Sequence, residues 1–223
     1  MLAAAKRSAS AAIILAYAVS IAVYTSLPEP HWQVPGAFRP EFGRLMIAFV
    51  LPSAAAVLYL LFNGLIKDAG TSEPPATAPY SNILLAILLF VIGLHAILLV
   101  GLLGGERAVG TRAPLILTGL AFLFVGNLLP QTRPNPFIGI RTRATLASRE
   151  AWMQLHRLVG YTSVAFGTVL IASAFVSERD RVRNVVSAAA AIGILVCVIG
   201  YRKQMQSRIG TARAISGDLD GKK

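Results

Sequence analysis

Apolar residues occur in this chain as long continuous runs, and the stretches between the runs are short and rich in charge, proline or glycine. Because a backbone in lipid must satisfy its own hydrogen bonds, an apolar run of roughly 17–25 residues predicts a transmembrane helix. Six runs, of which the fourth is the shortest, lie at residues 9–27, 45–66, 83–103, 114–129, 158–177 and 184–201. The pattern predicts an all-α fold, a polytopic transmembrane helical bundle of about six spans.

The stretches between the runs suggest how the chain is organised. We expect an N-terminal two-span unit with a Pro-rich first loop, then a Pro/Thr/Ala-rich linker that disfavours helix, then a four-span unit, and finally a basic tail that is mostly disordered. In this order the four parts are residues 1–67, 68–80, 81–201 and 202–223. The last two runs are separated only by residues 178–183, which predicts an antiparallel hairpin.

The first run follows Lys6 and Arg7, as the apolar segment of a signal peptide would. It is long, however, and continues into a Pro-rich loop without a small-x-small cleavage site. We therefore expect it to be a membrane helix of the protein.

Composition and charge support a membrane protein. The chain is 55% hydrophobic and only 14% charged, with a mean hydropathy of +0.64. The net charge of +11 comes from basic residues between and after the apolar runs, not from one continuous patch, so we expect membrane lipids as partners and no direct nucleic acid binding. With six spans, 14 of the 21 Lys and Arg residues fall on one side. The positive-inside rule then predicts a multi-pass protein of the cell membrane with both termini cytoplasmic.

The region 126–157 differs from the rest of the chain because polar, Gly and Pro residues crowd the ends of two apolar runs. Prolines at 130, 134 and 136 stop the preceding helix and favour extended backbone, while Gly139 permits a turn that most side chains resist. Ser148 is a good N-cap and Glu150 suits a first turn, so a new helix is expected to begin there.

On that helix Trp152 and His156 are four residues apart and share a face, with Arg149 one turn earlier, which predicts one interfacial patch. Trp152 is alternatively an anchor at the membrane interface. The arginines Arg141, Arg149 and Arg157 suit either recognition of a carboxylate or phosphate, or headgroup contacts that set topology.

The motifs of this region resemble the signature of the SdpI-type immunity protein family. They are, in order, Gly126-Asn127, Pro134-Asn135, Phe137-Ile138-Gly139-Ile140-Arg141-Thr142, Thr145-Leu146, Trp152 and His156-Arg157. The chain departs from the family pattern at Arg143-Ala144, where Pro-Trp is frequent, and at Tyr161, where a basic residue is expected.

The resemblance implies a binding and signalling protein that protects a bacterial cell from a secreted toxic peptide and holds a cytoplasmic repressor at the membrane. The residues it points to for binding are Asn127, Asn135, Gly139, Arg141, Thr142, Thr145, Trp152, His156 and Arg157. Asn127 also suits a helix cap or a bond between helices. A small transporter or a lipid or peptide exporter is the alternative function, although no inverted halves are evident.

Other chemistry has little support in the sequence. His95 is the one ionisable residue well inside a run, and it suits either a structural bond to a neighbouring helix or a proton or ligand role. The three histidines are scattered, without cysteines or carboxylates at ligand spacing, so we expect no metal and no cofactor. No nucleophile with a base partner can be named, and we expect no enzyme.

Overall fold

The computed structural model describes residues 2–27, 40–68, 74–104, 110, 112–134, 139–176 and 179–220, and every regular element within them is helical. The α-helices are α1 (Leu2–Val23), α2 (Pro40–Asp68), α3 (Pro74–Gly104), α5 (Arg112–Leu128), α6 (Arg143–Ala147), α7 (Arg149–Ser173) and α8 (Arg179–Asp220). Two short 3-10 helices are η1 (Tyr24–Ser26) and η2 (Leu129–Gln131). The predicted all-α class is confirmed.

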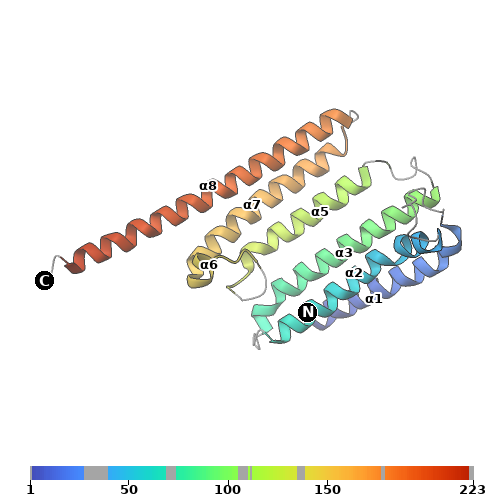
Figure 1. Cartoon of the computed structure of the whole chain (residues 1–223), viewed down its shortest axis with the longest axis horizontal. Coiled ribbons are helices and arrows are strands. Elements are labelled where there is room, and N and C mark those ends of the chain that lie inside the picture. The colour runs from blue at the N-terminus through green and yellow to red at the C-terminus, as the bar shows by residue number, and fades with distance from the viewer. Residues whose placement is uncertain are drawn as a thin grey trace.

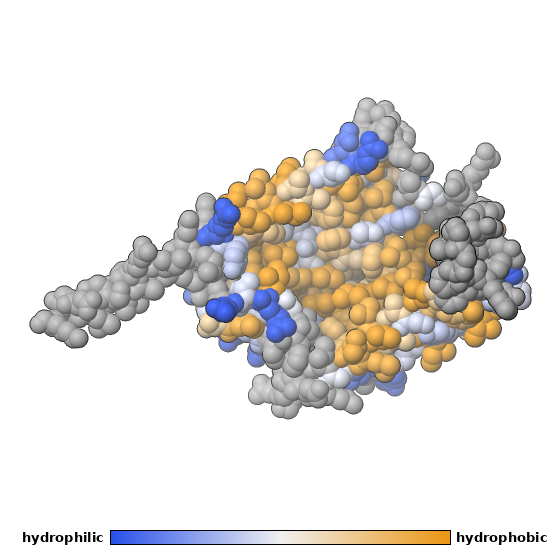
Figure 2. All heavy atoms as spheres, in the orientation of Figure 1, coloured by the Kyte–Doolittle hydropathy of each residue, from blue (hydrophilic) through white to orange (hydrophobic). Residues whose placement is uncertain are grey.

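Six of these helices are long and apolar enough to cross a membrane. The candidate spans are Lys6–Ser26, Gly43–Gly64, Pro79–Gly104, Arg112–Gln131, Arg149–Ser173 and Val182–Arg202. Their surfaces are also apolar: Ile14, Leu60 and Phe124 are between 63% and 68% exposed. Figure 2 shows this apolar surface over the helices, with the most hydrophilic residues gathered near its ends. A surface of this kind suits lipid and not water.

The helices form a three-helix group that extends into a row (Figure 1). Helices α1, α2 and α3 pack on one another, after which α3 contacts α5, α5 contacts α7, and α7 contacts α8. The predicted hairpin of the last two spans is therefore present as α7 and α8.

The core of the three-helix group shows where α3 belongs. Ala9 and Ile13 of α1 are buried with Ala55 of α2 and with Leu84 and Leu88 of α3 in one cluster. The predicted division between a two-span and a four-span unit does not match this packing, because α3 buries its apolar side chains against the helices that precede it.

Three boundaries differ from the sequence expectations. The predicted linker 68–80 is partly helical, since α3 begins at Pro74. Pro74 and Pro75 suit a first helical turn, whereas Pro79 lies inside the helix. The tail 202–223, expected to be mostly disordered, is helical through Asp220 as a continuation of α8, and no proline interrupts it. The fifth span, predicted at 158–177, is α7, which begins at Arg149 and ends at Ser173.

Candidate functional site

The site is built on the turn that ends α5. Pro130 lies in η2, and the chain after it becomes extended at Thr132, with φ of −76° and ψ of 153°. The backbone N–H and the Oγ1 hydroxyl of Thr132 both donate to the carbonyl oxygen of Leu129, at 3.1 and 2.7 Å. The proline therefore stops the helix as predicted, and these bonds satisfy a carbonyl at the helix end.

Trp152 lies against this turn from the first turns of α7. Its side chain is 0% exposed, and its indole Nε1–H donates to Thr132 Oγ1 at 3.2 Å. A buried indole needs such a partner. The interpretation of Trp152 as an interface anchor is wrong, because the ring is enclosed by protein.

His156 completes the buried pair. It is 0% exposed and stacks on Trp152, with ring centroids 4.1 Å apart and an angle of 13° between the planes. Its Nε2 accepts from the backbone N–H of Ile140 at 3.1 Å, and its Nδ1 lies 2.8 Å from the Trp152 carbonyl oxygen. Because a backbone N–H only donates and a carbonyl only accepts, Nδ1 carries the proton and the ring is neutral.

Gly139 closes the other side of the ring pair. It has φ of +110°, a conformation that L side chains rarely adopt. A Cβ atom there would lie 2.6 Å from His156 Nε2 and 2.8 Å from two ring carbons of Trp152. Glycine is thus required both for the backbone conformation and for the space.

Thr142 and Thr145 hold the next part of the loop. Thr142 is the N-cap of α6, and the two threonines form a reciprocal capping box, with Thr142 N–H donating to Thr145 Oγ1 at 2.8 Å. Thr145 is 1% exposed, and its hydroxyl donates to the carbonyl oxygen of Ile140 at 2.9 Å. The backbone of Ile140 is therefore bonded on both sides, by His156 at its N–H and by Thr145 at its carbonyl.

Arg141 follows directly after this doubly bonded residue, and its side chain is exposed. It has no hydrogen bond or ion pair with any residue that the structure describes. The hydrogen bonds of Ile140 therefore fix the position of the adjacent Arg141 backbone, while the Arg141 side chain is exposed.

The structure separates the predicted site residues into groups. Five of them meet around the buried rings of Trp152 and His156, namely Gly139, Thr142, Thr145, Trp152 and His156, of which Gly139 is exposed and Thr142 is half-buried. Arg141 and Arg157 are exposed, and Arg149 is exposed too, so the predicted patch of Arg149 with Trp152 and His156 is wrong. Asn127 lies apart from them on α5, where its backbone carbonyl oxygen accepts a hydrogen bond from Gln131 Nε2 at 3.1 Å. Asn135 lies outside the described residues.

Sequence reasoning missed the glycines that bring α5 against α7. A Cβ on Gly160 would lie 2.6 Å from the carbonyl oxygen of Gly126, and a Cβ on Gly167 would lie 2.6 Å from that of Gly119. Small residues of this kind allow helix backbones to approach closely in membranes. The sequence did contain a signal for this contact, because Gly119 and Gly126 on α5 are seven residues apart, as are Gly160 and Gly167 on α7.

It also missed Tyr80, which joins α3 to the same turn. The Tyr80 side chain is 5% exposed, and its hydroxyl accepts from the backbone N–H of Arg133 at 2.9 Å. No pattern around position 80 predicted this contact between segments 53 residues apart.

His95 lies in a separate polar contact within the three-helix group. It is 2% exposed, and its Nε2 is 2.7 Å from the hydroxyl of Ser20 on α1. Its Nδ1 has no hydrogen-bond partner among the described residues. The contact joins α3 to α1, as expected if His95 has a structural role in bonding a neighbouring helix.

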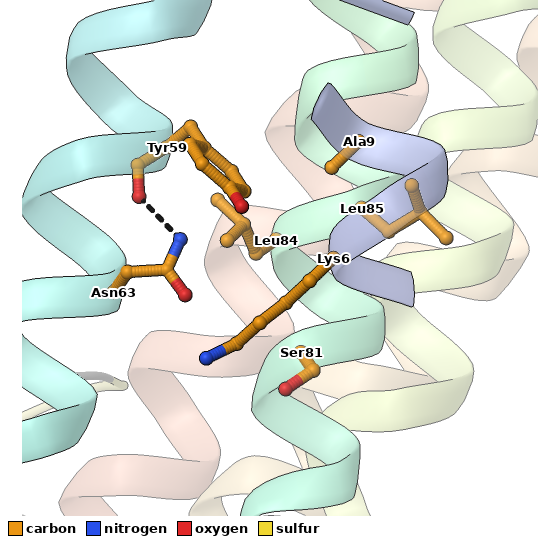
Figure 3. A pocket seen from close by; sticks show the side chains of 7 residues that line it. All are labelled: Lys6, Ala9, Tyr59, Asn63, Ser81, Leu84 and Leu85. Atoms are coloured by element: carbon orange, nitrogen blue, oxygen red, sulfur yellow. Dashed lines mark hydrogen bonds between the residues drawn. The ribbon is translucent and has the colours of Figure 1, made fainter. Parts of the chain in front are cut away.

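A small polar cavity at the end of the same group is shown in Figure 3. Lys6, Tyr59, Asn63 and Ser81 line it, together with apolar residues, and Asn63 Nδ2 donates to the Tyr59 carbonyl oxygen at 2.8 Å. Its volume of about 10 Å³ is room for about one water molecule, not for an organic ligand. Within the described residues no group of His, Cys, Asp and Glu could hold a metal ion.

Residues 131–201 match the profile of the SdpI/YfhL protein family, which confirms the resemblance seen in the sequence. The match begins in η2 and ends in α8, so it contains the whole buried cluster. Comparison with curated proteins and with solved structures gave no match.

Proposed function

From the family match over residues 131–201, we propose that this multi-pass membrane protein is an immunity protein of the bacterial cell membrane. It protects the cell from a secreted toxic peptide, and it holds a cytoplasmic repressor at the membrane. The observation that carries the proposal is that the matched segment contains a buried cluster around Trp152 and His156 that positions one exposed arginine.

The cluster and the arginine have different roles in this proposal. Trp152 and His156 are enclosed, so they shape the loop and do not contact a partner, and Gly139 leaves room for both rings. Arg141 is exposed and carries a planar fork of donors, which suits a carboxylate or a phosphate. Arg141 is therefore the contact residue, and the buried rings are its support.

The distribution of basic residues supports a contact on the cytoplasmic side of the membrane. The loop that carries Arg141 is on the side with 14 of the 21 Lys and Arg residues, which the positive-inside rule places in the cytoplasm. A cytoplasmic repressor would meet the protein there. Single cysteines placed at Ser207 and at Arg183 in a Cys197→Ser background should label from opposite sides of the membrane, and labelling from the same side would contradict this orientation.

Expression in a peptide-sensitive bacterium tests the function. Cells that carry the protein should survive the cognate peptide at concentrations that kill cells with an empty vector. Co-purification from those membranes, with and without the peptide, should recover a repressor only when the peptide is present. Equal killing of both strains at verified membrane abundance would contradict the immunity role. Peptide or lipid flux in proteoliposomes would indicate the alternative, a transporter or exporter.

A further inference from the structure

Helices α3 and α5 enclose a groove between them. Its volume is about 500 Å³, within the range of about 300–1,000 Å³ that small-molecule sites occupy. Leucine, alanine and phenylalanine side chains line it, and its two polar residues are Asn82 on α3 and Asn127 on α5. The lining residues of each helix recur at intervals of three and four, so each helix offers one face to the groove.

The length of the groove limits what can occupy it. On α5 the lining runs from Leu117 to Leu128, which at about 1.5 Å per residue is roughly 16 Å. The hydrocarbon core of a bilayer is about 30 Å thick, so the groove extends over about one leaflet. A transmembrane peptide helix would need a groove of the full thickness, whereas the acyl chain of a lipid needs only one leaflet.

The polar end of the groove suits a lipid headgroup region. Asn82 and Asn127 lie at this end, and two residues before Asn82 the hydroxyl of Tyr80 binds the backbone of Arg133. The side chain of Arg133 is exposed. An acyl chain in the groove would therefore have amide donors near its ester groups, and the cationic residue Arg133 would lie at the same end as its phosphate.

We propose that the groove between α3 and α5 is a binding site for one anionic glycerophospholipid of the leaflet at the loop end of the protein. The acyl chain lies against the apolar walls, and the headgroup lies beside Asn82, Asn127 and Arg133. Large side chains in and around the groove, such as Leu89 at 50% and Phe124 at 63% exposed, are covered by the lipid. This site is separate from the proposed immunity function and does not depend on it.

Native mass spectrometry of the full-length protein in detergent tests the site. Delipidated protein is titrated with phosphatidylglycerol and with phosphatidylcholine of the same acyl chains. We expect one phosphatidylglycerol to bind the wild type with the higher affinity. Ala121→Trp, which fills the groove, should weaken this binding about tenfold or more. Ala18→Trp is the matched control, because Ala18 is an exposed alanine on α1, and it should bind as the wild type does.

Two further variants keep the test decisive. Ala86→Phe fills the groove from α3, so agreement with Ala121→Trp excludes misfolding of one variant as the cause. Asn127→Leu should weaken phosphatidylglycerol binding by roughly three- to tenfold. Unchanged binding in both filled variants would overturn the proposal, and so would equal affinity for the two lipids. Dissociation of a dimer by the filled variants, or competition for the groove by an apolar peptide, would assign it instead to a second copy or to a peptide.

Discussion

The Nε2 atom of His156 accepts a hydrogen bond from the backbone N–H of Ile140 at 3.1 Å, across 16 residues of sequence. The other ring nitrogen is used within α7, by the Trp152 carbonyl oxygen. A neutral imidazole with both nitrogens bonded joins the loop to the helix, and the residue that follows Ile140 is the exposed Arg141. This relationship leads to the first prediction.

His156→Phe keeps an aromatic ring on Trp152 but removes the acceptor for Ile140. The half-buried N–H of Ile140 would then lack this partner, which lowers the free energy of unfolding by about 1–3 kcal/mol. Hydrogen exchange at Ile140 should become faster, and protection against the peptide should fall. His156→Gln, which retains an acceptor, should lose less. Unchanged exchange at Ile140 in the phenylalanine variant would show that the bond does not hold the loop.

Gly139→Ala should be much more damaging than Gly110→Ala. Gly139 and Gly110 both have positive φ, at +110° and +57° respectively. Among the residues that the structure describes, an added Cβ meets nothing within 4 Å at Gly110, whereas it meets both rings at Gly139. Backbone strain applies to both variants, and overpacking of about 1–3 kcal/mol applies only to Gly139→Ala. Thermal unfolding in detergent measures the difference. Equal destabilisation would mean that the rings move aside freely.

Arg141→Ala should insert normally and lose protection, because the guanidinium acts outside the fold. Arg141→Lys keeps the charge but loses the planar fork, so it should also be impaired if recognition is bidentate. Arg149→Ala, at an exposed arginine of the first turn of α7, is the control and should protect as the wild type does. Membrane abundance and survival against the peptide are measured together. Full protection by Arg141→Ala would show that this loop is not the contact surface.

Gly160→Ala should separate α5 from α7. The added carbon would lie 2.6 Å from the Gly126 carbonyl oxygen and 3.0 Å from two carbons of Pro130, so the helices must move apart. We expect a loss of about 1–3 kcal/mol in the free energy of unfolding. Gly193→Ala on α8 is the matched control, since no atom of the described part of the chain lies within 4 Å of a Cβ there, and its stability should stay near wild type. Similar stability of the two variants would contradict the close approach.

His95→Gln should leave protection against the peptide largely intact between about pH 6 and 8, the range around the reference titration of histidine. The neutral amide can still bond the Ser20 hydroxyl, so the contact between α1 and α3 is kept. Survival assays at several pH values, with membrane abundance measured in parallel, test this. Loss of protection at normal abundance would favour a proton-coupled transporter.

The elements of the fold follow from local properties of the sequence. Each apolar run must close its own backbone hydrogen bonds in lipid, so the six spans and their approximate places could be predicted without a structure. Ser148 was expected to begin a helix, and its hydroxyl does accept from the Ala151 N–H at 3.4 Å. Pro114 in the first turn of α5 and the turn at Gly139 agree with the same kind of local reasoning.

Which face of each helix is buried was decided only by the tertiary structure. In a soluble protein an apolar stripe marks the inward face, but in lipid the outward face is equally apolar, so hydrophobicity does not distinguish them. Trp152 therefore suited an interface anchor from the sequence and is enclosed in the fold. The close approach of Gly126 to Gly160 and the two-sided bonding of Ile140 join residues far apart in the chain, and the packing of α5 on α7 is what brings them together.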